Sequence, residues 1–236
     1  MSYEIVTICF LFHLADALYG ILRPIVFALR GGLVSGQATV ILASSNAGKI
    51  KEFNQLLSRL GMHVRPQADF GAIDVEETGL TFVENALLKA REASRISGLP
   101  ALADDSGLEV DILHGQPGIY SARYAGEPKS DARNNAKLLA ALVGIPAPRR
   151  TARYWCVLAY LRHPDDPVPL IVQRSWDGEI LTAPRGEGGF GYDSLFWLPS
   201  LGRSVAELGA EEKNRLSHRG RALQSLVTVL GETAAG

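Results

Sequence analysis

The pattern of apolar and polar residues predicts that strands and helices follow one another from residue 39 onward. Residues 39–43 form a short, apolar, β-branched run that is typical of a buried strand. A polar turn follows, and apolar residues then recur at helical spacing from Ile50 to Leu60, where Gly61 ends the helix. We therefore expect the folded region to open with a strand, a polar turn and a helix.

A capping pattern marks the next helix. Thr81 is expected to be its N-cap, with Glu84 reaching back to the cap, and Gly98 is expected to end it. Residues 100–103 then predict a second apolar strand. The polar residues that come next are therefore expected at the end of a buried strand.

The remaining pattern predicts two more helices and three more strands. The helices are expected at 130–142 and 217–230, and the strands at 153–161, 170–176 and 195–198. The first two of these strands are separated by a turn and predict a hairpin. Because the elements mix without a strict βαβ rhythm, we expect an α/β fold with a mixed sheet.

Charge and composition narrow the class of protein. In 236 residues, 24 Lys+Arg face 25 Asp+Glu, which argues against a protein that coats nucleic acid and against an acidic tail. The hydrophobic fraction of 47% and the charged fraction of 21% are those of an ordinary globular protein. Residues 1–39 contain few charges, so we divide the chain into an apolar N-terminal extension of unknown role (1–39) and a folded domain (40–236).

The extension matches neither a membrane span nor a signal peptide. A span needs about 20 mostly apolar residues, and this segment reaches that length only by including Asp16 and Arg23. A signal peptide needs basic residues before its apolar run, where this chain has Glu4. We expect no membrane association, with a membrane-tethered protein as the alternative. The two cysteines, Cys9 and Cys156, provide no disulfide framework, and we expect a cytoplasmic location.

The polar turn after the first strand suits a phosphate group. Such a turn leaves backbone N–H groups free beside the positive end of a helix dipole, and Lys49 adds a mobile charge. It is not a Walker loop, because the first glycine is missing and Ile50 replaces the Ser or Thr after the lysine. The alternative is an ordinary capped turn. The candidate substrate-binding residues are Ser44, Ser45, Asn46, Ala47, Gly48 and Lys49.

Two acidic segments are candidates for binding a metal. Asp104 and Asp105 follow an apolar strand, with a turn expected at Gly107. If the strand continues, its successive side chains point to opposite faces, so a second ligand must come from Glu76 or Glu77. Oxygen ligands without Cys or His favour Mg²⁺ over Zn²⁺. The alternatives are an acidic turn and a solvated acidic loop.

Two later clusters suit a nucleoside. Residues 188–193 contain three glycines, which allow a close approach of the backbone to a ligand, and Phe190 or Tyr192 offers a ring on which a base can stack. The alternative is a flexible loop. The second cluster consists of Lys213, His218 and Arg219; it lies near a helix start and suits keto oxygens or phosphate. The alternative for this cluster is a capped helix with exposed charges.

Together these clusters describe a site for a nucleoside triphosphate, and here the chain resembles the inosine/xanthosine triphosphate pyrophosphatase family. The resemblance extends over about residues 40–230. It implies an α/β fold with a long curved mixed β-sheet flanked by helices, two lobes with the active site in the cleft, and a homodimer. The matching stretches are 44–49, 76–86, 103–107, 117–124, 188–193 and 217–220.

The resemblance also implies an activity and residue roles. Deaminated purine nucleoside triphosphates (ITP, dITP and XTP) are hydrolysed with Mg²⁺ to the monophosphate and pyrophosphate, which removes them from the nucleotide pool. By resemblance, Glu76 and Asp105 bind the metal, Asp105 accepts the proton of the attacking water with Asp104 beside it, and Lys89 lies near the reacting phosphates. The triphosphate is bound by residues 44–49. The nucleoside and base contacts fall to Ser106, Phe190, Gly191, Tyr192, Asp193, Lys213, His218 and Arg219.

Two rival functions stay open at this point: a pyrophosphatase for other nucleotides, such as modified pyrimidines, and a non-catalytic nucleotide sensor. The carboxylates Glu76, Asp104 and Asp105 argue against a sensor, because a binding protein needs no proton acceptor. Donors from His218 and Arg219 suit the 6-keto group of hypoxanthine and xanthine. They would leave the 6-amino group of adenine unpaired, which costs about 1–3 kcal/mol of binding free energy. Guanine shares the keto group, so its exclusion must depend on the 2-position.

Overall fold

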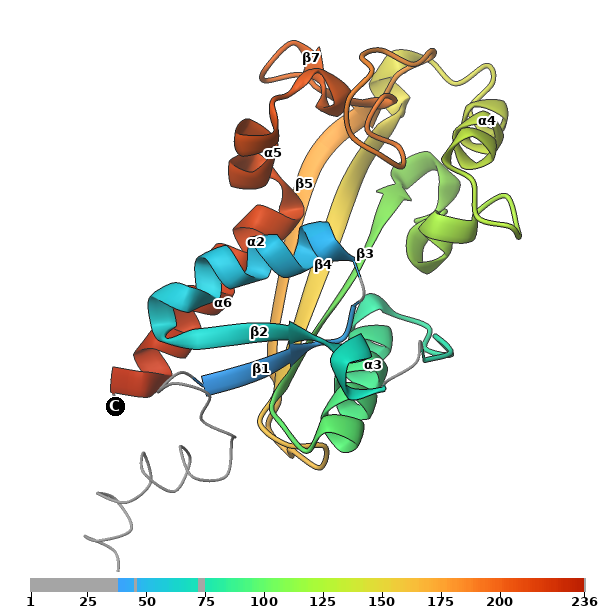
Figure 1. Ribbon diagram of the computed structural model, residues 1–236. Coiled ribbons are helices and arrows are strands. Elements are labelled where there is room, and N and C mark those ends of the chain that lie inside the picture. The colour runs from blue at the N-terminus through green and yellow to red at the C-terminus, as the bar shows by residue number, and fades with distance from the viewer. Residues whose placement is uncertain (1–37, 45, 72–74, 236) are drawn as a thin grey trace, which may run out of the picture.

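The computed structural model describes residues 38–44, 46–71 and 75–235. Within these residues a seven-stranded sheet has the order β2-β1-β3-β4-β5-β6-β7 (Figure 1). β1 runs parallel to β2 and β3, and the later pairs are antiparallel, which confirms the predicted mixed sheet. The strands are β1 (Ala38–Leu42), β2 (Met62–Pro66), β3 (Ala101–Val110), β4 (Thr151–Leu161), β5 (Leu170–Ile180), β6 (Phe196–Leu198) and β7 (Arg203–Ser204).

Helices cover both faces of the sheet. α3 packs through its small residues against one face of β1, β3 and β4, and α2 and α6 cover the other face (Figure 1). α4 and α5 lie at the far end of the long β4–β5 hairpin, where a second apolar cluster forms. The helices are α2 (Ala47–Leu57), α3 (Phe82–Ser97), α4 (Asp131–Ala141), α5 (Ala210–Leu216) and α6 (His218–Ala235).

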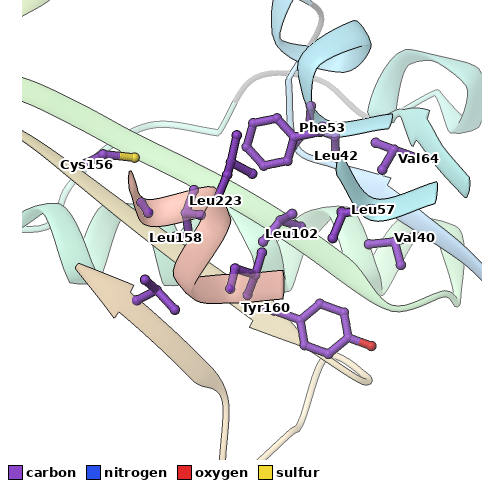
Figure 2. Close-up of a cluster of buried hydrophobic side chains, with 13 residues drawn as sticks. Val40, Leu42, Phe53, Leu57, Val64, Leu102, Cys156, Leu158, Tyr160 and Leu223 are labelled. Atoms are coloured by element: carbon purple, nitrogen blue, oxygen red, sulfur yellow. The ribbon is translucent and has the colours of Figure 1, made fainter. Parts of the chain in front are cut away.

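The core beneath α2 and α6 fixes the strands that lead into the cavity. Figure 2 shows Leu42, Phe53 and Leu102 gathered with Leu223 of α6. All four side chains are fully buried. Burying each large apolar side chain contributes about 1.5–3 kcal/mol, so this cluster anchors the end of β1 and the start of β3.

The side chains of β3 alternate between the two helical layers. Ala101 and Ala103 face the α3 layer, and Leu102 faces α2 and α6. The alternation continues to the carboxylates, because Asp104 contacts cations of α2 and α6 whereas Asp105 contacts a cation of α3. The two adjacent aspartates therefore lie on opposite faces of the sheet.

The predicted turn at Gly107 was wrong, because β3 continues as far as Val110. An added Cβ at Gly107 would lie 2.5 Å from Gly118 O and 2.7 Å from Ser121 Oγ. The glycine is needed for the close crossing of the segment Gly118–Arg123, a short 3-10 helix, over an extended strand. The sequence signal was correct in requiring glycine, but the reason is packing.

Other predictions were confirmed or incomplete. α3 has the predicted capping box at Thr81 and ends at Gly98, which has a φ of 67°. β2, β7 and α5 were not predicted. The predicted extension at 1–39 falls outside the described residues except for its last two, which begin β1 at Ala38. No described helix combines the length and the apolarity that crossing a membrane requires.

Candidate active site

The structure contains a cavity of about 820 Å³. Its walls come from the start of α2, the middle of β3, α3, the segment Gly118–Arg123, the loop at 188–193 and the region where α5 meets α6. The structure therefore gathers most of the predicted residues in one place. Those that line the cavity are Asn46, Gly48, Lys49, Lys89, Asp104, Asp105, Ser106, Phe190, Gly191, Tyr192, Asp193, Lys213, His218 and Arg219.

The start of α2 differs from the open phosphate loop that was predicted. Asn46 is the N-cap, and its Oδ1 accepts hydrogen bonds from Gly48 N at 2.9 Å and Lys49 N at 3.1 Å. These two backbone N–H groups are therefore not free for a phosphate. The hydroxyl of Ser44 accepts a bond from Asn46 N, and Ser45 lies outside the described residues. Lys49 and the helix dipole are what this turn offers an anion.

Asp104 is a buried carboxylate shared by two cations. Lys49 Nζ lies 2.7 and 3.0 Å from its two oxygens, and Arg219 Nε and Nη2 each lie 3.4 Å from Oδ2. The side chain of Asp104 is 1% exposed. Burial alone would raise the pKa of Asp104, but Lys49 and Arg219 hold it well below its usual range. Because its oxygens are bonded to cations and its pKa is depressed, Asp104 is a poor proton acceptor. It is better suited to holding Lys49 and Arg219 together.

Asp105 belongs to a separate cluster on the α3 face. Lys89 Nζ lies 2.8 Å from Asp105 Oδ1 and 3.0 Å from Glu77 Oε1, and Arg123 lies 3.1 Å from Glu77 Oε2. Burial raises the pKa of Asp105, and Lys89 offsets this only in part. Burial acts on Glu77 in the same direction, but Lys89 and Arg123 outweigh it and lower its pKa. Two carboxylates thus face each other across one lysine.

The two adjacent glutamates of the acidic loop lie in different surroundings. Glu77 lines the cavity, while Glu76, the metal ligand taken from the resemblance, is exposed and does not line it. The loop is pinned to α3, because Gly79 N donates to the buried Asn85 Oδ1 at 2.9 Å. The sequence pattern made both glutamates candidates. The path of the loop, which is bonded to Asn85, places only Glu77 in the cavity. Metal binding by Glu76 stays a prediction.

The glycine loop at 188–193 is built around Asp193. Its carboxylate accepts from Phe190 N at 2.8 Å, from Lys213 Nζ at 2.5 Å and from Tyr154 Oη at 3.3 Å. An added Cβ at Gly189, which has a φ of 78°, would lie 2.1 Å from Asp193 Oδ2, so this position requires glycine. The loop is therefore wrapped tightly around one carboxylate.

The two aromatic candidates of this loop have different roles. Tyr192 is 4% exposed, and its hydroxyl donates to Ser121 O at 2.8 Å, so it belongs to the core. Phe190 is 64% exposed, and Lys213 Nζ lies 4.3 Å from the centre of its ring. Phe190 is the ring that this loop offers to a base.

His218 and Arg219 line the cavity from the start of α6. His218 stacks on Tyr154 with 4.9 Å between ring centres, and it is 8% exposed. Burial, together with Arg219 and Lys213, lowers the pKa of His218 well below its ordinary value, so its ring is neutral. Its Nδ1 is buried and has no hydrogen-bond partner within the described residues. A buried nitrogen without a partner is rare in folded proteins, and it marks His218 as a candidate for a functional role.

Sequence reasoning did not select several residues that line the cavity. Arg123 holds Glu77 and lies inside a stretch that carried the resemblance, which was the available signal. Glu52 lies one helical turn after Lys49, a spacing that places both on one face of α2. Asp131, at the start of α4, lines the cavity although that helix showed no chemical signal in the sequence.

Known proteins with similar sequences cover most of this chain. A "dITP/XTP pyrophosphatase" of Shigella flexneri is 55% identical over 191 residues, covering 81% of this chain and 97% of the relative. One of Ralstonia nicotianae is 58% identical, covering 80% of this chain and 94% of the relative. The relatives thus match almost all of their own length.

Solved structures match over the same region. A HAM1 protein from Coxiella burnetii has a TM-score of 0.79 at 49% identity, covering 82% of this chain and 98% of the other. A "Nucleoside-triphosphatase / dITP/XTP pyrophosphatase" from Mycobacterium abscessus has a TM-score of 0.70 at 41% identity, covering 81% and 99%. The model of the Ham1 family matches residues 40–229. By sequence and by fold, this chain is a member of the Ham1 family.

Proposed function

We propose that this enzyme hydrolyses dITP, ITP and XTP to the nucleoside monophosphate and pyrophosphate. The observation that carries the proposal is that one buried carboxylate, Asp104, holds two cations that line the cavity. Its carboxylate binds Lys49, which is suited to phosphate, and Arg219, which is suited to a base. The names of the relatives indicate the same activity. Removal of these nucleotides from the nucleotide pool is the corresponding cellular role.

The charges of the cavity suit a nucleotide that arrives with a divalent cation. The lining holds as many acidic as basic side chains, so a bare triphosphate would add several negative charges to a neutral surface. Within the described residues no cluster of three or more His, Cys, Asp or Glu is able to enclose a metal. Mg²⁺ is commonly held by one or two carboxylates together with substrate phosphates. Cavity carboxylates that bind a metal together with substrate phosphates therefore fit Mg²⁺.

In our proposal Asp105 is one ligand, and the second is a glutamate of the acidic loop. The resemblance implies Glu76, and the geometry favours Glu77 because its carboxylate and that of Asp105 both contact Lys89. Bound Mg²⁺ would neutralise phosphate charge and orient the attacking water.

The protein's own groups supply the rest of the chemistry. Asp105 accepts the proton of the attacking water, which is general-base catalysis. Lys89 lies beside it and stabilises the negative charge that develops on the phosphates. Lys49 binds the triphosphate from the other face of the sheet. Asp104 holds Lys49 in place and is not itself the base.

Base selection depends on the donors that the start of α6 contributes to the cavity. Arg219 can donate to the 6-keto group of hypoxanthine or xanthine, whereas the 6-amino group of adenine would find no acceptor on this guanidinium. Leaving such a buried polar group unpaired costs about 1–3 kcal/mol, which corresponds to about 5-fold to 150-fold in preference. His218, which precedes Arg219 and lines the same cavity, is the second base-contacting residue in this proposal.

The test is the release of pyrophosphate with Mg²⁺ from ITP, dITP, XTP, GTP and ATP. We expect turnover of the first three and little of ATP. Equal rates with ATP and ITP would contradict the proposal, and binding without release would favour a nucleotide sensor. Turnover of modified pyrimidine nucleotides alone would favour the rival pyrophosphatase. We also propose a homodimer, on the resemblance, and a cytoplasmic location, on the use of cysteine.

A further inference from the structure

α4 holds both walls of the cavity through two consecutive asparagines. Asn134 is buried; its Oδ1 accepts from Ala125 N at 2.8 Å, and its Nδ2 donates to Ala122 O at 3.1 Å. Asn135 bonds the opposite wall, since its Nδ2 donates to Gly191 O at 2.9 Å. One helix therefore sets the spacing between the wall after β3 and the glycine loop.

Asp131 lies one turn earlier on α4, and together with Asn135 it bonds both backbone polar groups of Gly191. Its Oδ2 accepts from Gly191 N at 2.6 Å, while Asn135 bonds Gly191 O. Gly191 has a φ of 61°, a conformation that favours glycine. α4 thus binds the N–H and the C=O of the residue directly after Phe190.

Bonds from α4 add to the order that Asp193 gives the glycine loop from within. Phe190 N is bonded to Asp193 within the loop, and the hydroxyl of Tyr192 adds one buried bond to Ser121 O. A segment with three glycines loses much conformational freedom when it is ordered. Bonds from α4 therefore contribute directly to how firmly the exposed ring of Phe190 is held.

We propose that Asp131 and Asn135 are positioning residues that hold Phe190 in place for the base and thereby set the affinity for the nucleoside. The proposal rests on the proposed function, in which Phe190 stacks on a purine. Both residues bond the backbone beside Phe190 and not the lysines of the phosphate end. Loss of either bond should therefore weaken binding of the base and leave binding of phosphate unchanged.

Matched variants separate the hydrogen bond from the charge. Asp131→Ala and Asp131→Asn both remove the negative charge at the start of α4, but only Asp131→Asn keeps an oxygen that can accept from Gly191 N. Asn135→Asp places a carboxylate oxygen where the donor to Gly191 O stood, at nearly constant size. Asn135→Ala is the second variant at that position if Asn135→Asp does not fold.

The experiment is calorimetric titration of the full chain with IMP and, separately, with inorganic pyrophosphate. We expect Asp131→Ala and Asn135→Asp to weaken IMP binding about tenfold, with Asp131→Asn close to wild type and pyrophosphate binding changed by less than about twofold. A purely structural role would lower Tm without this selectivity. Unchanged IMP affinity, or equal loss for both ligands, would overturn the inference alone. Wild-type protein that does not bind IMP would overturn the proposed function with it.

Discussion

Replacing Asp104 by Asn removes one charge from a buried ion-pair cluster and nearly preserves its shape. Lys49 and Arg219 would then be left without the carboxylate that both contact. Removing one partner of a buried pair typically destabilises a protein by about 3–5 kcal/mol. The side chain of Lys49 is 26% exposed and can turn to water, so we expect the lower end of that range. The free energy of unfolding should fall by about 3 kcal/mol.

The assay is urea unfolding together with thermal unfolding. For a domain of this size, each kcal/mol lowers Tm by about 2–4 °C, so we expect a decrease of about 6–12 °C. Asp165→Asn is the matched control, since Asp165 is exposed in the β4–β5 turn and should change stability by less than about 0.5 kcal/mol. Lys49→Met in both backgrounds gives a double-mutant cycle, in which we expect a coupling of at least about 1 kcal/mol.

The pH dependence gives an independent check with a definite sign. The pKa of Asp104 is lower in the folded protein than in the unfolded chain, where an aspartate titrates near about 3.9. Its contribution to stability is therefore complete above that value and is lost as the pH falls toward the folded-state pKa. The gap between wild type and Asp104→Asn should narrow below about pH 4. A gap that stays constant with pH, or a loss below about 1 kcal/mol, would refute the reasoning.

Three other predictions follow from the site. Asp105→Asn should still bind nucleotide, measured calorimetrically, but lose pyrophosphate release; retained turnover would remove Asp105 from the mechanism. Glu77→Gln should raise the Mg²⁺ concentration for half-maximal activity by about tenfold, whereas Glu76→Gln should leave it within about twofold; the reverse order would restore the assignment taken from the resemblance. A shortened chain that begins at Ala38, where β1 starts, should keep full activity, and a large loss in a turnover assay would assign the preceding residues a part in the fold.

Local signals in the sequence were sufficient to predict elements whose ends are fixed by neighbouring residues. α3 could be predicted to the residue, because Thr81 and Glu84 bond each other within one turn and Gly98 ends the helix without help from distant residues. The antiparallel hairpin of β4 and β5 was equally local. β2 was missed because a five-residue run that contains the polar residues His63 and Arg65 becomes a strand only by pairing with β1.

The roles of individual carboxylates could not be read from local sequence. Glu76 and Glu77 are adjacent, and the bond from Gly79 to Asn85 decides which of them lies in the cavity. Asp104 was predicted beside the catalytic base, whereas its partners come from residues 55 and 115 positions away. Contacts at such separations are properties of the packed molecule, and no periodicity or spacing in the chain predicts them.

The placement of Asp104 and Asp105 on opposite faces of β3 has a consequence for altering this enzyme. Substitutions around Lys49 and Arg219 change the layer that Asp104 faces, and substitutions around Lys89 change the other layer. Base preference and rate of hydrolysis should therefore be adjustable by separate sets of mutations, although the two carboxylates are joined by one peptide bond. Libraries aimed at a new base can leave Lys89 and its layer unchanged. By contrast, deleting one residue of β3 ahead of Asp104 would exchange the faces of both carboxylates and abolish both properties at once.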